Sequence, residues 1–176
     1  MHNLQPEDTD DTIMTDEPMF LVDRMLGPLT RYLRFLGYDS ESAALLPEGD
    51  PGEDNHLLKK AEEEGRLLLT RDRDLASRAG ERGIYIADID LPDQIRLLHE
   101  KGLISLDVRL IRCSVCNTLL REAAADEIAG ASYAPKPSDL FTFLWCPGCS
   151  RLYWNGSHTE SIIRRIRGLY ERGRSP

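Results

Sequence analysis

The sequence predicts an α/β protein in which a parallel β-sheet flanked by helices precedes a small cysteine-rich module. Short apolar segments alternate with segments of helical periodicity four times before residue 107, which favours parallel strands covered on both faces. The apolar run 67–69 leads directly into Thr70 and two aspartates, as a buried strand does when it ends at a polar edge. Two Cys-x-x-Cys pairs then follow after residue 107.

The expected elements can be placed in chain order. Strands are expected over 19–22, 42–46, 67–70 and 83–87, where apolar residues cluster. A helix is predicted over 25–36, because apolar residues recur there at helical spacing and Gly37 then stops it. Further helices are expected over the following segments: 54–64, from Asp72 or Asp74 to about 82, 91–101, and a basic helix over about 161–171.

Charge divides the chain into three expected regions. Residues 1–18 hold six acidic residues, no basic residue and no apolar periodicity, which is typical of a disordered tail. Residues 19–107 form the expected α/β domain, and residues 108–176 the cysteine-rich module with its basic end. The net charge of −8 is uneven: residues 1–107 carry 24 acids and 12 bases, a balance of −12, whereas residues 108–176 carry 6 and 10, a balance of +4.

Composition narrows the class of protein. The chain is 41% hydrophobic and 30% charged, which is typical of a globular protein. No apolar run reaches the roughly 18 residues that span a membrane, and the first residues do not resemble a secretory signal. We therefore expect a cytoplasmic protein that has no membrane partner.

The four cysteines form two pairs of equal spacing, Cys113-Ser-Val-Cys116 and Cys146-Pro-Gly-Cys149. Two short turns of this kind can each present two sulfurs to one ion, so the spacing predicts a tetrahedral zinc site in a zinc ribbon. Four thiolates leave no open coordination position, and the zinc is therefore expected to be structural. Two alternatives stay open: disulfides, which an intracellular compartment disfavours, and His158 as a ligand in place of one cysteine.

Four carboxylates lie where expected strands end or helices begin: Asp23, Asp54, Asp72 and Asp74. In a parallel sheet these points meet at one edge, where open α/β folds keep their sites. Carboxylates held close together repel each other unless a cation offsets the charge, and Mg²⁺ or Mn²⁺ prefers such oxygen ligands. The pattern indicates a site for one or two divalent cations, to which Thr70 or Asn55 could add a contact.

The same aspartates also have structural interpretations. Asp54, Asp72 and Asp74 are each suited to be helix N-caps, and Asp23 could form an ion pair with Arg24. Only their joint occurrence favours a metal site.

Three segments together resemble a known family. FLVDRMLGPLTRYLRFLGYD, EDNHLLKKAEEEGRLLLTRDRDL, and CSVC with CPGCSRLYWNGSH are similar, in order and spacing, to the Mut-seven C-terminal RNase-domain family. The resemblance implies a PIN-like α/β/α fold with a C-terminal zinc ribbon, and Mg²⁺- or Mn²⁺-dependent cleavage of RNA phosphodiesters. The acidic positions of the family fall on these residues: Asp23, Asp54 and Asp72, with Asp74 as a fourth. Its metal-binding cysteines fall on the four present here: Cys113, Cys116, Cys146 and Cys149.

Several basic and aromatic residues are candidates for contact with RNA. Arginines near the aspartates could bind phosphate bidentately or form a solvated face: Arg24, Arg31, Arg34 and Arg71. Tyr153 and Trp154 could stack on unpaired bases or form the core of the ribbon, and His158 could contact RNA. The last helix offers basic residues for nonspecific phosphate contact: Arg164, Arg165 and Arg167.

Together these features predict a divalent-metal-dependent ribonuclease that acts on single-stranded RNA at the aspartate cluster. The zinc ribbon and the basic end are expected to position RNA or to dock onto a ribosome or another ribonucleoprotein. The alternative is a noncatalytic RNA- or ribosome-binding protein, in which the aspartates are only caps and ion pairs. A phosphatase with an Asp72-x-Asp74 nucleophile pair is disfavoured, because this motif follows the third expected strand instead of the first.

Overall fold

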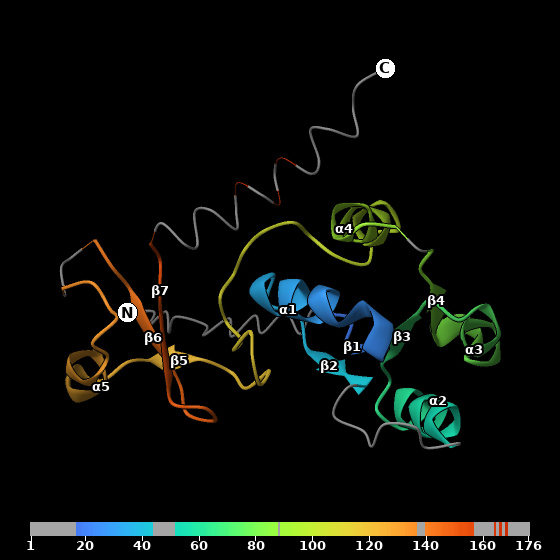
Figure 1. The fold of residues 1–176 in the computed structure, drawn as a ribbon, viewed down its shortest axis with the longest axis horizontal. Coiled ribbons are helices and arrows are strands. Elements are labelled where there is room, and N and C mark those ends of the chain that lie inside the picture. The colour runs from blue at the N-terminus through green and yellow to red at the C-terminus, as the bar shows by residue number, and fades with distance from the viewer. Residues whose placement is uncertain are drawn as a thin grey trace, which may run out of the picture.

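The structure, a computed structural model, describes residues 17–43, 52–87, 89–136 and 140–156, together with Arg164, Ile166 and Gly168. A four-stranded parallel sheet is followed by a three-stranded antiparallel sheet (Figure 1). The predicted fold class, a parallel sheet flanked by helices and followed by a small cysteine-rich ribbon, is confirmed. Almost all of the acidic tail, and three candidate RNA contacts, lie outside the described residues: His158, Arg165 and Arg167.

The parallel sheet has the strand order β2-β1-β3-β4. Its strands are β1 (Phe20–Val22), β2 (Ser40–Ser42), β3 (Leu67–Thr70) and β4 (Gly83–Tyr85). From β1 the chain moves outward to β2 at one edge, and it then returns to β3 on the other side of β1. The carboxyl ends of β1 and β3 therefore form a topological switch point, the place where open α/β sheets leave a crevice for ligands.

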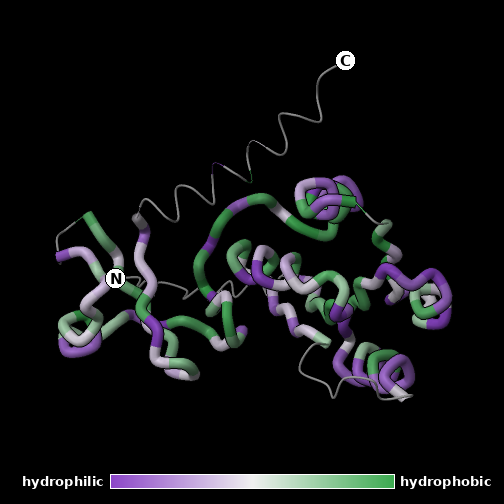
Figure 2. The backbone as a smooth tube through the Cα atoms, viewed as in Figure 1, coloured by the Kyte–Doolittle hydropathy of each residue, from purple (hydrophilic) through white to green (hydrophobic). Residues whose placement is uncertain are grey.

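Helices cover both faces of this sheet. α1 (Gly27–Phe35) and α4 (Leu91–Glu100) pack on one face, and α2 (Glu53–Glu63) and α3 (Arg73–Arg78) pack on the other. Alternation along β1 explains the two cores, because Phe20 and Val22 point toward α1 and α4, whereas Leu21 points toward α2 and α3. Figure 2 shows that the helices around the sheet carry both hydrophobic and hydrophilic residues.

The boundaries differ from the expected ones in instructive places. The second strand, expected at 42–46, is described as Ser40–Ser42, and residues 44–46 lie outside the described residues. Its start was not predicted because a polar edge strand carries no apolar signal. The helix expected over 25–36 consists of a 3₁₀ turn, η1 (Arg24–Leu26), followed by α1. α3 is shorter than expected, and a second 3₁₀ turn, η3 (Gly80–Arg82), follows it.

Close packing explains the glycine that begins β4. A Cβ atom on Gly83 would lie only 1.9 Å from the carbonyl oxygen of Ala76 in α3. Any side chain at this position would therefore separate α3 from the strand.

The ribbon follows as β5 (Arg121–Glu122), α5 (Ala125–Gly130), β6 (Phe143–Cys146) and β7 (Arg151–Trp154). Its strands are antiparallel in the order β5-β6-β7. Phe143 and Leu152 are buried in a small core, against which Trp145 and Trp154 also pack. In Figure 1 this module lies beside the carboxyl end of α1.

Of the expected terminal helix, Arg164, Ile166 and Gly168 are described, and all three are helical. Ile166 is completely buried in the core beneath α1 and α4, so the chain returns from the ribbon to the α/β domain. Within the described part of the chain, no helix is both long and apolar enough to cross a membrane.

Candidate functional site

The switch point brings Asp23 and Asp72 to a shared threonine. Asp23 follows β1, and its backbone N–H donates to the carbonyl of Leu69 in β3. Thr70, the completely buried last residue of β3, donates its hydroxyl to Asp23 Oδ2 at 2.6 Å. The same hydroxyl oxygen accepts a 3.0 Å hydrogen bond from the backbone N–H of Asp72. One side chain thus fixes both aspartates relative to the sheet.

Both aspartates also cap helices. Asp72 is the N-cap of α3, and its Oδ1 accepts hydrogen bonds from the backbone N–H groups of Asp74 and Leu75. Asp23 is the N-cap of η1, where its Oδ1 accepts from Met25 N–H at 3.4 Å. Among the described residues, no donor reaches Oδ2 of Asp72. That oxygen is available to a cation or to a substrate group.

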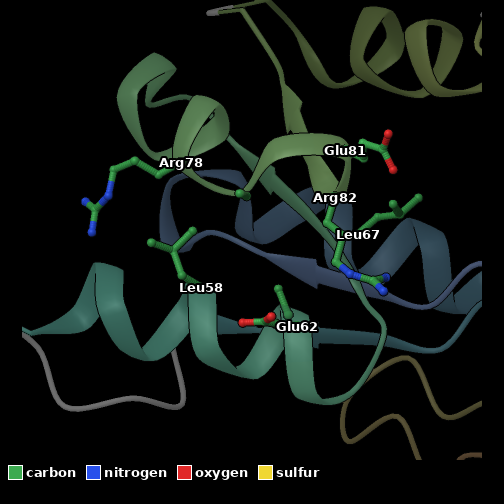
Figure 3. Close-up of a pocket in the computed structure, with 8 residues that line it drawn as sticks. Leu58, Glu62, Leu67, Arg78, Glu81 and Arg82 are labelled. Atoms are coloured by element: carbon green, nitrogen blue, oxygen red, sulfur yellow. The ribbon is translucent and has the colours of Figure 1, made fainter.

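Asp54 and Asp74 are joined through a different residue, Arg78. Asp54 lies in the first turn of α2, whose N-cap is Gly52, so Asp54 is not the cap. Nη1 of Arg78 lies 3.4 Å from Asp54 Oδ2 and 3.8 Å from Asp74 Oδ2, and Nη2 donates to Asn55 Oδ1 at 2.6 Å. Figure 3 shows Arg78 reaching from α3 toward the amino end of α2. The four aspartates therefore form two pairs.

A cation at these aspartates would need further ligands from water or substrate. Among the described residues, only the four cysteines form a group of three or more candidate ligands within 4.8 Å of one another, so the aspartates do not make a closed cage. Mg²⁺ commonly binds through one or two carboxylates, several waters and substrate phosphates. The pair Asp23 and Asp72 fits that mode of binding, and the assignment of a cation to it stays a prediction.

The four cysteines fulfil the geometry expected of a metal site. All four are free thiols, and their sulfurs lie within 4.8 Å of one another. Cys113 Sγ lies 3.5 Å from Cys149 Sγ, and Cys116 Sγ lies 3.3 Å from Cys146 Sγ. A tetrahedron with Zn–S bonds of about 2.3 Å has sulfur–sulfur edges of about 3.8 Å. The cluster could therefore hold zinc after only a small adjustment.

Local hydrogen bonds lower the pKa values of the two cysteines in the first turn, Cys113 and Cys116, whereas burial raises those of Cys146 and Cys149. Burial acts to raise the pKa of the Cys116 thiol, but hydrogen bonds with Thr118 and with neighbouring sulfurs outweigh it and lower the pKa to about 6. The Tyr153 hydroxyl lies 3.0 Å from Cys113 Sγ. Burial and this cysteine both raise the pKa of Tyr153, so the phenol remains protonated and can donate to a thiolate. Tyr153 thus supports the cysteine site directly.

Arg34 joins the first cysteine turn to the α/β domain. Its side chain is 6% exposed. It donates to the carbonyls of Ser40 at 2.8 Å, Ser114 at 3.3 Å and Val115 at 2.6 Å. Because the guanidinium is buried and occupied by backbone oxygens, the expectation that Arg34 contacts RNA is not retained. Its position indicates a structural role.

A second polar link lies beside Arg34. Asn117, next to the first cysteine turn, donates to Asp39 Oδ1 at 2.9 Å and accepts from the Ser40 N–H at 3.2 Å. Arg112 lies 3.3 Å from the other oxygen of Asp39. The first cysteine turn is therefore tied to the β2 edge of the parallel sheet.

The remaining candidate RNA contacts differ in their exposure and in their partners. Arg24 pairs with Glu53 at 3.2 Å, and Arg71 lies between Thr70 and Asp72 in the loop that follows β3. Arg31 and Arg164 are exposed. Trp154 packs against the ribbon core, which is the structural alternative to base stacking.

A cleft of about 530 Å³ lies between α2 and the segment containing α3 and η3 (Figure 3). It is lined by Leu67, the first residue of β3, by Glu62 and by Arg82. This is the amino end of β3, whereas Thr70 and Asp72 lie at its carboxyl end. The cleft is therefore separate from the aspartates, apart from Arg78 at its rim.

Sequence reasoning missed Arg78 as a member of the site. The available signal was its i,i+4 spacing from Asp74, which places the two side chains on one helix face. Its contact with Asp54, 24 positions away, depends on how α2 and α3 pack and is not visible in the sequence.

Fold and site together define an open α/β protein with an acidic switch point and a tightly docked four-cysteine ribbon. The family model described as the Mut7-C RNAse domain matches residues 18–166, and the chain belongs to this family. This confirms the family resemblance, and the family's description indicates a nuclease-type function and RNA as substrate. Comparisons with curated proteins and with solved structures found no match.

Proposed function

We propose that this protein is a metal-dependent ribonuclease that hydrolyses RNA phosphodiesters at the carboxyl ends of β1 and β3. The observation that carries the proposal is the convergence of Asp23 and Asp72 on the Thr70 hydroxyl at the switch point. Membership of the Mut7-C RNAse family supports RNA as the substrate. The two aspartates come from segments about 50 residues apart, and the pairing of β1 with β3 brings both to the same threonine.

Each residue of the pair has a role in this proposal. Asp23 and Asp72 would hold Mg²⁺ or Mn²⁺, which supplies activation of water and neutralisation of phosphate charge when it is bound. Thr70 keeps the Asp23 carboxylate in one orientation, so that little ordering remains to be done when substrate arrives. Asp54 and Asp74, held by Arg78, add negative charge at the rim and could complete a second cation site.

The zinc proposed for the four cysteines has a structural role. All four ligands are protein thiolates, so no position is left for substrate. Zinc would fix both cysteine turns, and the first turn is held against the parallel sheet by Arg34 and Asn117. The ribbon is thereby placed as a rigid extension of the nuclease domain, suited to positioning RNA or to docking onto a ribonucleoprotein.

End-labelled single-stranded and duplex RNA can test the nuclease directly. Purified wild type, Asp72→Asn and Asp23→Asn would be incubated with and without Mn²⁺ in metal-depleted buffer, with zinc retained in the ribbon. We expect metal-dependent cleavage by wild type alone. Asp126→Asn, on the exposed first turn of α5, is the matched control and should cut as wild type does. Equal cutting by wild type and both site variants would refute the proposal.

A noncatalytic RNA-binding role is the second candidate, and the helix caps favour it. Asp23 and Asp72 both accept backbone hydrogen bonds, which is a sufficient structural reason for an aspartate at each position. In that case wild type and both variants would bind RNA equally, and none would cleave it.

A further inference from the structure

A groove runs along the seam between α1 and the ribbon, remote from the cleft between α2 and α3. Its volume is about 380 Å³. One wall is Arg31 of α1, and the other walls come from the first cysteine turn, with Val115, and from β7, with Arg151. Because Cys149 also lines it, the shape of this groove depends on the cysteine site.

The two arginines of the groove have no acidic partner. Among the described residues, no carboxylate lies within 4.0 Å of Arg31 or Arg151, and the recorded contact of Arg31 is with the ring of Phe35 at 5.5 Å. Most other described arginines are paired with carboxylates: Arg24, Arg66, Arg78, Arg96, Arg109, Arg112 and Arg121. In an acidic protein, two unpaired guanidinium groups in one groove mark it as a site for an anion.

An aromatic ring is fixed beside these charges. Tyr133 is 60% exposed, yet its hydroxyl accepts a 3.0 Å hydrogen bond from the Leu152 N–H. Its ring lies 6.1 Å from that of Trp154, which supports it from the ribbon core. The exposed ring is therefore held in place before any ligand binds, and binding costs little side-chain entropy.

We propose that this groove binds a single-stranded segment of RNA, with phosphates on Arg31 and Arg151 and an unpaired base stacked on Tyr133. Alternation of negative phosphates with flat bases matches the two arginines and the fixed ring. A duplex would not offer an unpaired base to the tyrosine. The choice of RNA as ligand rests on the proposed function, whereas the groove itself rests on these contacts.

The groove and the aspartate pair can serve one RNA strand. Arg31 lies eight residues beyond Asp23, across the 3₁₀ turn η1 and the first residues of α1, which is roughly 12–16 Å at about 1.5–2.0 Å per residue. A stacked strand rises about 3.4 Å per nucleotide, so about four nucleotides would connect the two sites. The groove would thus hold the substrate on one side of the bond to be cut.

The test measures RNA binding without cleavage. All proteins would be full-length, zinc-loaded and in the Asp72→Asn background, with no added divalent cation. A fluorescent single-stranded oligonucleotide would be titrated at several KCl concentrations. We expect Arg31→Gln/Arg151→Gln to weaken binding and to reduce the salt slope, log K against log[KCl], by about 1.4, at about 0.7 per lost phosphate contact. The control Arg82→Gln removes an arginine from the distant cleft and should change the slope much less.

Tyr133 can be tested in two ways. Tyr133→Ala should weaken binding at least about five-fold with little change of slope. Tyr133→Phe keeps the stacking ring but loses the hydrogen bond from the Leu152 N–H, and it should therefore weaken binding less than alanine does. Because alanine could disturb the ribbon, RNA containing 4-thiouridine would also be crosslinked to the Asp72→Asn protein with its groove intact. We expect mass spectrometry to find the crosslink on Tyr133 or its neighbours.

The outcomes separate this inference from the nuclease proposal. Groove-dependent binding by a protein that never cuts RNA would support the groove and refute the nuclease. If wild type cleaves RNA, and Arg31→Gln/Arg151→Gln changes neither RNA affinity nor salt slope, the nuclease proposal is supported and the groove proposal is refuted. Equal affinity for duplex and single strands, losses matched by Arg82→Gln, or crosslinks confined to other segments would each overturn the groove proposal.

Discussion

The Thr70 hydroxyl donates a 2.6 Å hydrogen bond to Asp23 Oδ2 across the two central strands of the sheet. The Thr70 hydroxyl oxygen also accepts a hydrogen bond from the Asp72 N–H, so this buried threonine connects the two segments that carry the proposed catalytic carboxylates. A hydroxyl can do both because it donates one hydrogen bond and accepts others. Valine has nearly the same shape and can do neither.

Thr70→Val should therefore weaken both the fold and the proposed activity. Leaving Asp23 Oδ2 and the Asp72 N–H without this partner should reduce the free energy of unfolding by about 1–3 kcal/mol. It should also slow metal-dependent cleavage, because Asp23 loses its fixed orientation. Urea unfolding and single-turnover cleavage measure the two effects. Thr70→Ser keeps the hydroxyl and is the control; if it loses as much cleavage as valine does, the hydrogen bond is not the cause.

Arg78 should compete with a divalent cation for the rim carboxylates. Its guanidinium lies within 4.0 Å of both Asp54 and Asp74, and a unit charge at about 4 Å is worth about 1 kcal/mol in water. Arg78→Gln should therefore tighten Mn²⁺ binding about five-fold. The binding would be measured by electron paramagnetic resonance on zinc-loaded protein. Arg82→Gln removes a charge from the same cleft without touching Asp54. Unchanged or weaker Mn²⁺ binding in Arg78→Gln would exclude these two aspartates from the cation site.

The acidic edge of the sheet could be predicted from the two strands that lead to it. Buried strands of a parallel sheet appear as short apolar runs, and both Asp23 and Asp72 come just after such runs. The cysteine site could be predicted for a similar reason, since each pair of ligands lies within four residues. In both cases a short sequence pattern could be combined with a general structural rule: parallel strands end at one edge of a sheet, and paired Cys-x-x-Cys turns bind one ion.

The features that escaped prediction depend on contacts between distant residues. Arg34 and Val115 are 81 positions apart. In the sequence, Arg34 is only a polar residue within the predicted helix, and nothing there indicates its contact with Val115. β2 consists of Ser-Glu-Ser, so its pairing with β1 leaves no hydrophobic trace. Tyr133 lies in a turn after α5. This helix has only six residues, which is too short for a helical spacing of apolar residues to predict it.

Removal of Arg34 should loosen the ribbon from the nuclease domain. Arg34→Met keeps much of the buried side-chain length but leaves three carbonyl oxygens without their charged donor. Hydrogen bonds to charged groups are worth about 1.5–3 kcal/mol each and are not additive, so we expect a loss of about 3 kcal/mol in the free energy of unfolding. Zinc should also pass faster to a chromophoric chelator. The exposed neighbour Arg31→Met should change neither quantity; equal effects of both variants would contradict the role of Arg34.

Asp39 should make the junction between sheet and ribbon sensitive to acid. Burial acts to raise the pKa of Asp39, but hydrogen bonds from Arg66 at 2.6 Å and Asn117 at 2.9 Å, with the charge of Arg112, outweigh it and bring the pKa below its ordinary value of 3.8. A carboxylate with a depressed pKa stabilises the folded state above its unfolded pKa, and this stability is lost as the pH falls through the folded pKa. Its contribution should be complete near pH 6 and should decline as the pH falls below about 4.

Asp39→Asn isolates that contribution. Asparagine cannot carry the charge that pairs with Arg66 and Arg112, so the variant should be less stable than wild type near pH 6, and the difference should shrink as the pH falls below about 4. Urea unfolding at a series of pH values gives the difference directly. Asp126→Asn, an exposed residue in the ribbon, should run parallel to wild type throughout. A constant gap between Asp39→Asn and wild type down to pH 3 would show that Asp39 acts through shape and hydrogen bonding instead of through its charge.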